Sequence, residues 1–257
     1  MMDVLVSEWT KMRTVRSTWW ALAAAPAAGG GLAWLLGLSF RHQLDAGSSL
    51  GRGPFDPLFG SFYVLTLAQL ALVVFAVLVA GGEYSSGTIR ASLAATPRRG
   101  VFYAGKVLGA ALPLAAVSLL TVIAAFVAGQ AALGPHAAWL GGDAWRAITG
   151  SWLYLTLISL FALGVAMVLR GPALSLGVLL PVLFLNSQGL GNVPAIRAVT
   201  QYLPDQAGTL IMHVAGPPDH PAFPTSYGPW TGTALLAAWA AVALTAGYLL
   251  LRDRDAT

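Results

Sequence analysis

The sequence has no cysteine and very few charged side chains. Without cysteine it can form neither disulfides nor thiolate metal sites. Only 9% of the 257 residues are charged, whereas soluble domains contain about 25%. So few charges cannot cover a surface that faces water, and 57% of the residues are hydrophobic. We therefore expect lipid to be the main solvent of the chain, and its net charge of +4 does not indicate nucleic-acid binding.

The sequence also lacks the motifs of common enzymes. It contains neither GxSxG nor HExxH, and its four histidines show no metal-ligand spacing. The segment Gly100–Lys106 matches the start of a phosphate-binding loop, but Val107 stands where serine or threonine must bind magnesium. We therefore expect no catalytic residue, cofactor or metal site in this chain.

Six uncharged apolar segments are long enough to cross a bilayer as helices, which takes about 20 residues. They predict an all-α membrane protein. A single domain over residues 1–257 is expected, because the longest polar stretch, 197–229, is shorter than the roughly 50 residues of a small domain. The first segment could be a signal peptide, but its length exceeds the roughly 7–15 apolar residues of such peptides and favours an uncleaved span. The predicted spans are 18–39, 58–82, 107–130, 147–169, 172–190 and 230–251.

The positions of lysine and arginine predict the orientation. If the spans alternate in direction, ten of the 14 basic residues fall on one side and four on the other, while the acidic residues divide equally. Short loops rich in basic residues face the cytoplasm. We therefore predict a multi-pass plasma-membrane protein whose two termini and loop 83–100 are cytoplasmic, with 197–229 external.

The N-terminal segment 1–17 is polar but periodic. Leu5, Trp9 and Met12 recur at helical spacing, which predicts an amphipathic helix on the membrane surface. A frayed basic tail is the alternative.

A few polar or helix-breaking residues interrupt the spans and the external segment. Gln69 and Asn186 can either bond a neighbouring helix or contact a substrate in a pathway. Pro181 predicts a kink in the fifth span. The external residues 207–214 have helical spacing and predict either a short helix dipping into the membrane or an irregular loop.

The loop between the second and third spans keeps the most charge. Glu83 stands at the membrane edge, Ile89 and Leu93 share one helical face, and Pro97 ends the pattern. Its basic residues alone would only set the orientation, but the order of the others predicts a short helix held against the membrane surface. The candidates for its N-terminal cap are Ser85, Ser86 and Thr88.

With this loop the sequence resembles the type-2 export permeases, the membrane subunits of ATP-binding cassette (ABC) transporters, and most closely the alanine-rich ones of actinobacteria. The resemblance rests on Glu83–Arg90 and on Pro97–Gly100. It extends over essentially the whole chain, through the opening Glu8–Lys11, the external Tyr202–Pro204 and the closing Leu251–Asp255.

The resemblance implies six membrane helices per subunit, with an N-terminal interfacial helix and a short cytoplasmic coupling helix between the second and third spans. Its partners would be a cytoplasmic ATPase, which holds ATP and magnesium, and a second permease subunit, identical or a close paralogue. One departure is Ser85, which stands where the family pattern has arginine, so Arg90 may have to supply the basic contact. The implied ATPase-contact residues are Glu83, Tyr84, Gly87, Thr88 and Arg90.

The function implied by this resemblance is ATP-driven export of a hydrophobic or amphipathic substrate, with no bond chemistry in this chain. One alternative is a non-transporting membrane module, an immunity or sensor partner, that recruits a cytoplasmic protein through the same loop. A secondary carrier is a third reading, and the absence of any carboxylate from the predicted spans argues against it.

Overall fold

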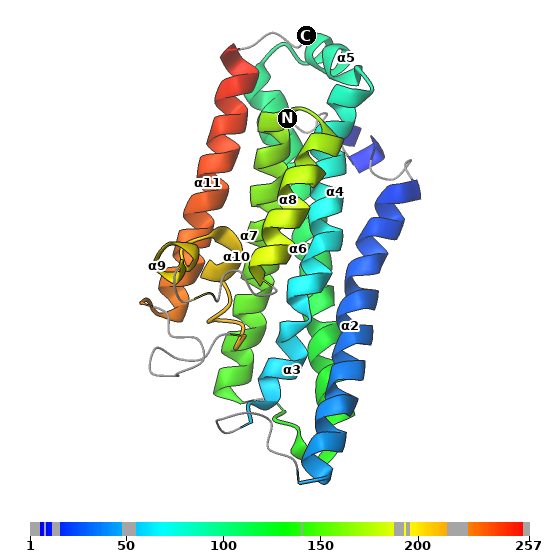
Figure 1. The fold of residues 1–257 in the computed structure, drawn as a ribbon. Helices are drawn as coiled ribbons and strands as arrows, with labels where there is room; N and C mark the ends of the chain where they lie inside the picture. Colours follow the sequence, from blue (N-terminus) through cyan, green and yellow to red (C-terminus); the bar gives the residue numbers. More distant parts are fainter. Residues whose placement is uncertain are drawn as a thin grey trace.

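The computed structural model describes residues 6–7, 9–11, 16–47, 55–139, 141–187, 193, 196–214 and 226–253. Over these residues the chain is mainly helical and contains no strand. Long helices run side by side, and the short helix α5 lies across one end of the bundle (Figure 1). The last residues of α11 lie at this end too, which we call the α5 end; the opposite one is the far end.

The elements follow one another along the chain with short connections. In order they are α2 (Arg16–Asp45), α3 (Pro57–Tyr63), α4 (Leu65–Ser85), α5 (Thr88–Ala95), α6 (Arg99–Leu133), the 3-10 helix η1 (Gly134–His136), α7 (Gly142–Leu169), α8 (Pro172–Ser187), α9 (Arg197–Thr200), α10 (Pro204–Ala207) and α11 (Pro229–Asp253).

Five helical stretches are long and apolar enough to cross a membrane: Trp19–Asp45, Pro57–Ser85, Arg99–His136, Gly142–Leu169 and Pro229–Asp253. They confirm the architecture of a multi-pass helical membrane protein, but not the count of six. The difference is α8, whose 16 residues extend about 24 Å at 1.5 Å per residue, against a hydrocarbon core of about 30 Å. The fifth predicted span therefore remains a prediction.

Two span boundaries differ from the predicted ones. The second span consists of two helices, α3 and α4, which meet at Val64. The third begins at Arg99 rather than at residue 107, and its 35 residues extend about 52 Å, well beyond the hydrocarbon core. Lys106, predicted to belong to the loop, therefore lies inside α6, where it faces the end of α4.

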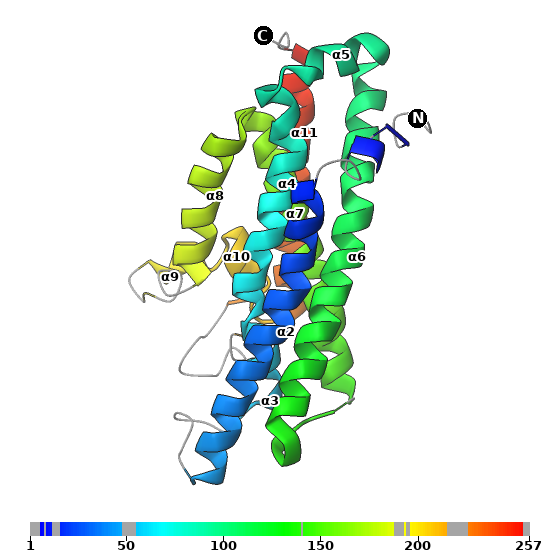
Figure 2. The same cartoon turned by 90° about the vertical axis from the view of Figure 1, so that its right-hand side faces the viewer.

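The bundle is organised around α7, which packs against α4 and α11, while α2 packs along α6 (Figures 1 and 2). The α2–α6 approach is close because a Cβ on Gly37 would lie 2.8 Å from the carbonyl oxygen of Gly129. The helix α8 lies at the outside of the bundle, beside α4 (Figure 2). This arrangement leaves one side of α4 covered only by α8.

Candidate functional site

The most unusual polar feature of the fold is the burial of Glu83 at the C-terminal end of α4. Its side chain is 9% exposed and lies between two lysines. The Lys106 ammonium is 3.0 Å from Oε2, within ion-pair distance but not aligned for a hydrogen bond, and its side chain is only 1% exposed. Lys106 also donates to the carbonyl oxygen of Val79 at 3.3 Å and lies over the ring of Phe102. Glu83 and Lys106 thus join the ends of two consecutive antiparallel helices.

The second lysine connects this pair to the N-terminal segment. Lys11 donates to Oε1 of Glu83 at 2.5 Å and to Oγ of Ser92 on α5 at 3.3 Å. Four segments therefore meet at one carboxylate: the helical residues 9–11, the end of α4, α5, and the start of α6. We call Lys11, Glu83, Ser92 and Lys106 the Glu83 cluster. Because carboxylates are rarely buried unless paired, the position of Glu83 depends on these lysines.

The helix α5 lies on the surface above this cluster. Ile89 is buried and Leu93 packs against the core, so the predicted apolar face is confirmed. The predicted cap is wrong: the N-cap is Gly87, at φ 72°, and no side chain caps the helix. Serine and threonine resist this left-handed conformation, which glycine adopts freely. The hydroxyls of Ser86 and Thr88 instead lie 2.9 Å from each other.

The exposed side of the loop has a single sign of charge. Residues 85–98 contain no acidic residue, and the exposed basic side chains are Arg90 and Arg98. Gly87 and Thr88 are also exposed, whereas the Glu83 side chain points inward and Tyr84 is half-buried. Of the predicted contact residues, Gly87, Thr88 and Arg90 thus form an outer surface, while Glu83 and Tyr84 lie beneath it.

Tyr84 takes part in a contact with the α7–α8 turn. The Arg170 guanidinium lies over its ring, 5.7 Å from the centroid, a cation–π arrangement. The other predicted residues have separate positions. Trp9 is helical and exposed, whereas Leu5 and Met12 lie outside the described residues. Asn186 belongs to α8, and its side chain lies outside the described part of the chain.

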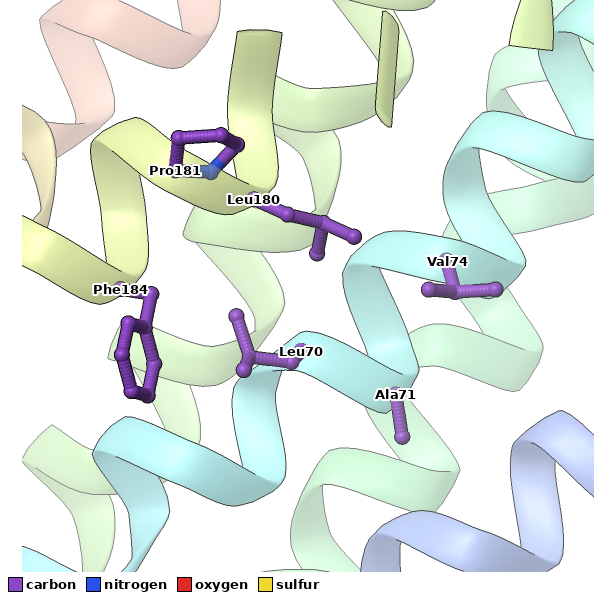
Figure 3. A pocket seen from close by; sticks show the side chains of 6 residues that line it. All are labelled: Leu70, Ala71, Val74, Leu180, Pro181 and Phe184. Atoms are coloured by element: carbon purple, nitrogen blue, oxygen red, sulfur yellow. The ribbon is translucent and has the colours of Figure 1, made fainter. Parts of the chain in front are cut away.

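An open apolar groove separates α4 from α8 in the middle of the bundle (Figure 3). Its volume is about 450 Å³. Figure 3 shows side chains of both helices bordering it, with the ring of Phe184 at one edge. No charged residue lines this groove, so it suits an apolar guest. The lining residues are Leu70, Ala71, Val74, Leu180, Pro181 and Phe184.

Gln69, next to the groove residue Leu70, points into the bundle and is completely buried. Its Oε1 accepts a 2.6 Å hydrogen bond from the hydroxyl of Tyr154 on α7, and that hydroxyl also lies 3.3 Å from the carbonyl oxygen of Asp205. Gln69 thus joins α4 to α7 and to the segment around α10. In that segment Asp205 is itself 0% exposed, which the sequence gave no reason to expect in a polar, proline-rich stretch.

The α10 segment is also attached at the far end. The ring of His213 lies 2.8 Å from Oδ2 of Asp56, while Oδ1 accepts the backbone N–H of Leu58 and so caps α3. Burial alone would raise the pKa of Asp56, but the hydrogen bonds from His213 and Leu58 outweigh it and lower that pKa. The ionised form of Asp56 is therefore the one that the fold stabilises.

Within the described residues, no group of three or more histidine, aspartate or glutamate side chains is arranged to hold a metal. Comparison with known proteins finds no matching family model and no matching curated protein. Function therefore has to be argued from the geometry of this chain: a buried ion cluster beneath an exposed basic helix, and an apolar groove beside the same long helix.

Proposed function

We propose that the chain is the permease subunit of an ATP-driven ABC exporter, with the α5 end in the cytoplasm. The observation that carries this proposal is the Glu83 cluster, because it fastens an exposed helix to the ends of two membrane-length helices. A force applied to α5 is then transmitted to α4 and α6 through an ion pair rather than through a flexible loop. The resemblance of the loop sequence to export permeases supports the same conclusion.

In this proposal the exposed surface of α5 binds the ATPase. Gly87, Thr88 and Arg90 supply the outer contact, and the absence of acidic residues from 85–98 favours an acidic groove on the partner. Glu83 acts from beneath, as a positioning residue that holds α5 against the bundle. Tyr84 has a similar inner position. Neither side chain needs to touch the ATPase directly.

The groove between α4 and α8 is the proposed part of the pathway within one subunit. Its apolar lining and its volume of about 450 Å³ suit a hydrophobic or amphipathic substrate. The groove is open on one side, and a second permease subunit facing it would close the path. ATP and magnesium belong to the partner ATPase.

The test is purification of the tagged chain from its native membranes in mild detergent. We expect a protein that hydrolyses Mg·ATP to be purified with it and to be lost with Arg90→Glu, because the reversed charge repels an acidic groove. Arg146→Glu is the matched control, since Arg146 is also exposed but lies at the far end. Retention of the ATPase by Arg90→Glu would remove α5 as the contact. A partner bound through α5 without ATP hydrolysis would favour the recruiting module.

A secondary carrier is the second candidate, and Asp205 is the observation in its favour. The sequence argument against a carrier relied on the absence of carboxylates from the spans, yet this carboxylate is buried in the bundle from outside them. Buried carboxylates in membrane proteins often serve ion or proton relays. A carrier would transport in ATP-free vesicles under an ion gradient and would stop with Asp205→Asn, whereas the exporter requires ATP.

A further inference from the structure

The turn between α7 and α8 has an unusual residue at its first position. Arg170 has φ 58° and caps the C-terminus of α7 in the left-handed conformation. Glycine is the usual residue at such a position, because a Cβ makes this conformation costly. The next residue in the chain is Gly171, so the turn places a glycine beside the position that needs one and an arginine at the position itself. A non-glycine residue held in a rare conformation suggests that its side chain has a role.

The side chain of Arg170 connects three helices. Its guanidinium lies over the ring of Tyr84, on α4, and Nη2 donates to the carbonyl oxygen of Leu250 at 2.9 Å, near the C-terminus of α11. A cation is favourable at that helix end. Since the backbone of Arg170 leads directly into α8, the same residue joins α4 and α11 to the start of α8.

A second contact beside Arg170 strengthens the connection between α4 and α8. Gly81 of α4 lies against Pro172, the first residue of α8, and a Cβ on Gly81 would be 2.9 Å from the proline nitrogen. Gly81 precedes Glu83 by less than one helical turn. The end of α4 therefore contacts the Glu83 cluster on one side and the start of α8 on the other.

We propose that Arg170 is a positioning residue that transmits movement from the Glu83 cluster and α5, through Tyr84, to α8 and hence to the groove that α8 borders. The inference rests on the proposed function for the meaning of that movement, but the mechanical connection can be tested without any partner. In the exporter, ATP-driven displacement of α5 would tilt the end of α4, and Arg170 would make α8 follow it.

The absence of native cysteine allows a direct test on the purified full chain. Spin labels on Ser85→Cys and Leu174→Cys, both exposed, report the distance between the end of α4 and the start of α8. We expect Arg170→Gly to keep the fold, because glycine suits the backbone, but roughly to double the width of this distance distribution, since a helix end that loses its tertiary contacts opens locally. Tyr84→Leu, which leaves the Arg170 backbone unchanged, should broaden it as well.

Two controls separate this role from a general loss of packing. A label pair on Leu35→Cys and Leu120→Cys, in α2 and α6, should be unaffected by Arg170→Gly. Arg99→Gln removes hydrogen bonds to the carbonyl oxygens of Leu251 and Arg252 without touching Tyr84, and should leave the α4–α8 distribution narrow. An unchanged α4–α8 width in both Arg170→Gly and Tyr84→Leu would overturn the inference.

A functional arm distinguishes failure of the inference from failure of the proposed function. In the complex with its ATPase, Arg170→Gly should lose transport while ATP hydrolysis continues. If no ATPase is purified with the chain, the exporter is refuted, and the spin-label widths still decide the role of Arg170. Full transport by Arg170→Gly, in a complex that hydrolyses ATP, would count against the inference alone.

Discussion

Replacing Glu83 by glutamine preserves the shape of the side chain but removes the charge that two lysines share. The larger effect comes from Lys106, because its side chain is only 1% exposed and its ammonium cannot turn to water. Removing one partner of a buried ion pair costs about 3–5 kcal/mol, since the other charge is left without compensation. The Val79 carbonyl and the Phe102 ring stay in contact with Lys106, so we expect the lower half of that range.

The Lys11 contact contributes much less to the same free energy. Its side chain is 40% exposed, and partly exposed ion pairs contribute roughly 0.2–1 kcal/mol. Lys11→Met should therefore lower the free energy of unfolding by that smaller amount. The two lysines form an internal comparison, because they bind the same carboxylate from a buried and from an exposed position.

The assay is denaturant unfolding of the purified protein in detergent micelles, followed by tryptophan fluorescence. The decisive variant is Glu83→Gln combined with Lys106→Met, because replacing a buried pair entirely by uncharged groups is often neutral. We expect this double variant to recover most of the loss caused by Glu83→Gln alone. A single Glu83→Gln variant within about 1 kcal/mol of the native protein, or a double variant no more stable than the single one, would refute the buried-pair account.

Three further predictions concern the rest of the bundle. Tyr154→Phe should lower the free energy of unfolding by about 0.5–1.5 kcal/mol, because the hydroxyl that joins α7 to Gln69 is lost; the same change in a Gln69→Leu background should cost clearly less. Gly81→Ala should destabilise by about 1–3 kcal/mol as its Cβ presses on α8, whereas Gly82→Ala, with nothing within 4 Å of the new Cβ, should not lower the thermal unfolding midpoint. Asp56 has a lowered pKa, so its contribution is complete above the ordinary value of 3.8 and is lost as pH falls through the lowered pKa. Acid titrations should therefore give Asp56→Asn a shallower loss of stability below that pH than the native chain, and equal slopes would contradict the assignment.

Much of this fold is predictable from the sequence because it depends on local pattern. Long uncharged segments predict the membrane-length helices, and the spacing of Ile89 and Leu93 predicts the buried face of α5. The boundary of α6 is different: Arg99 and Lys106 read as loop charges, yet the helix continues through them. Charge near a span end does not by itself show where a helix begins, since a buried partner can compensate it.

The Glu83 cluster was only partly accessible to sequence reasoning. Glu83 and Lys106 stand at facing ends of consecutive antiparallel spans, so opposite charges there could have suggested a pair. The contact of Lys11 was not predictable, because it depends on how the N-terminal helix lies on α5. The burial of Asp205 depends likewise on how the α10 segment packs against α7, which no local pattern in a proline-rich stretch specifies.

The measurement that tests the central claim most directly is transport in proteoliposomes that contain the tagged chain and the proteins purified with it. A lipophilic fluorescent dye serves as substrate, with and without Mg·ATP. The exporter account predicts dye movement that requires ATP hydrolysis and is lost with Arg90→Glu but not with Arg146→Glu. Dye movement that proceeds without ATP, or a preparation that contains no ATP-hydrolysing partner, would contradict it.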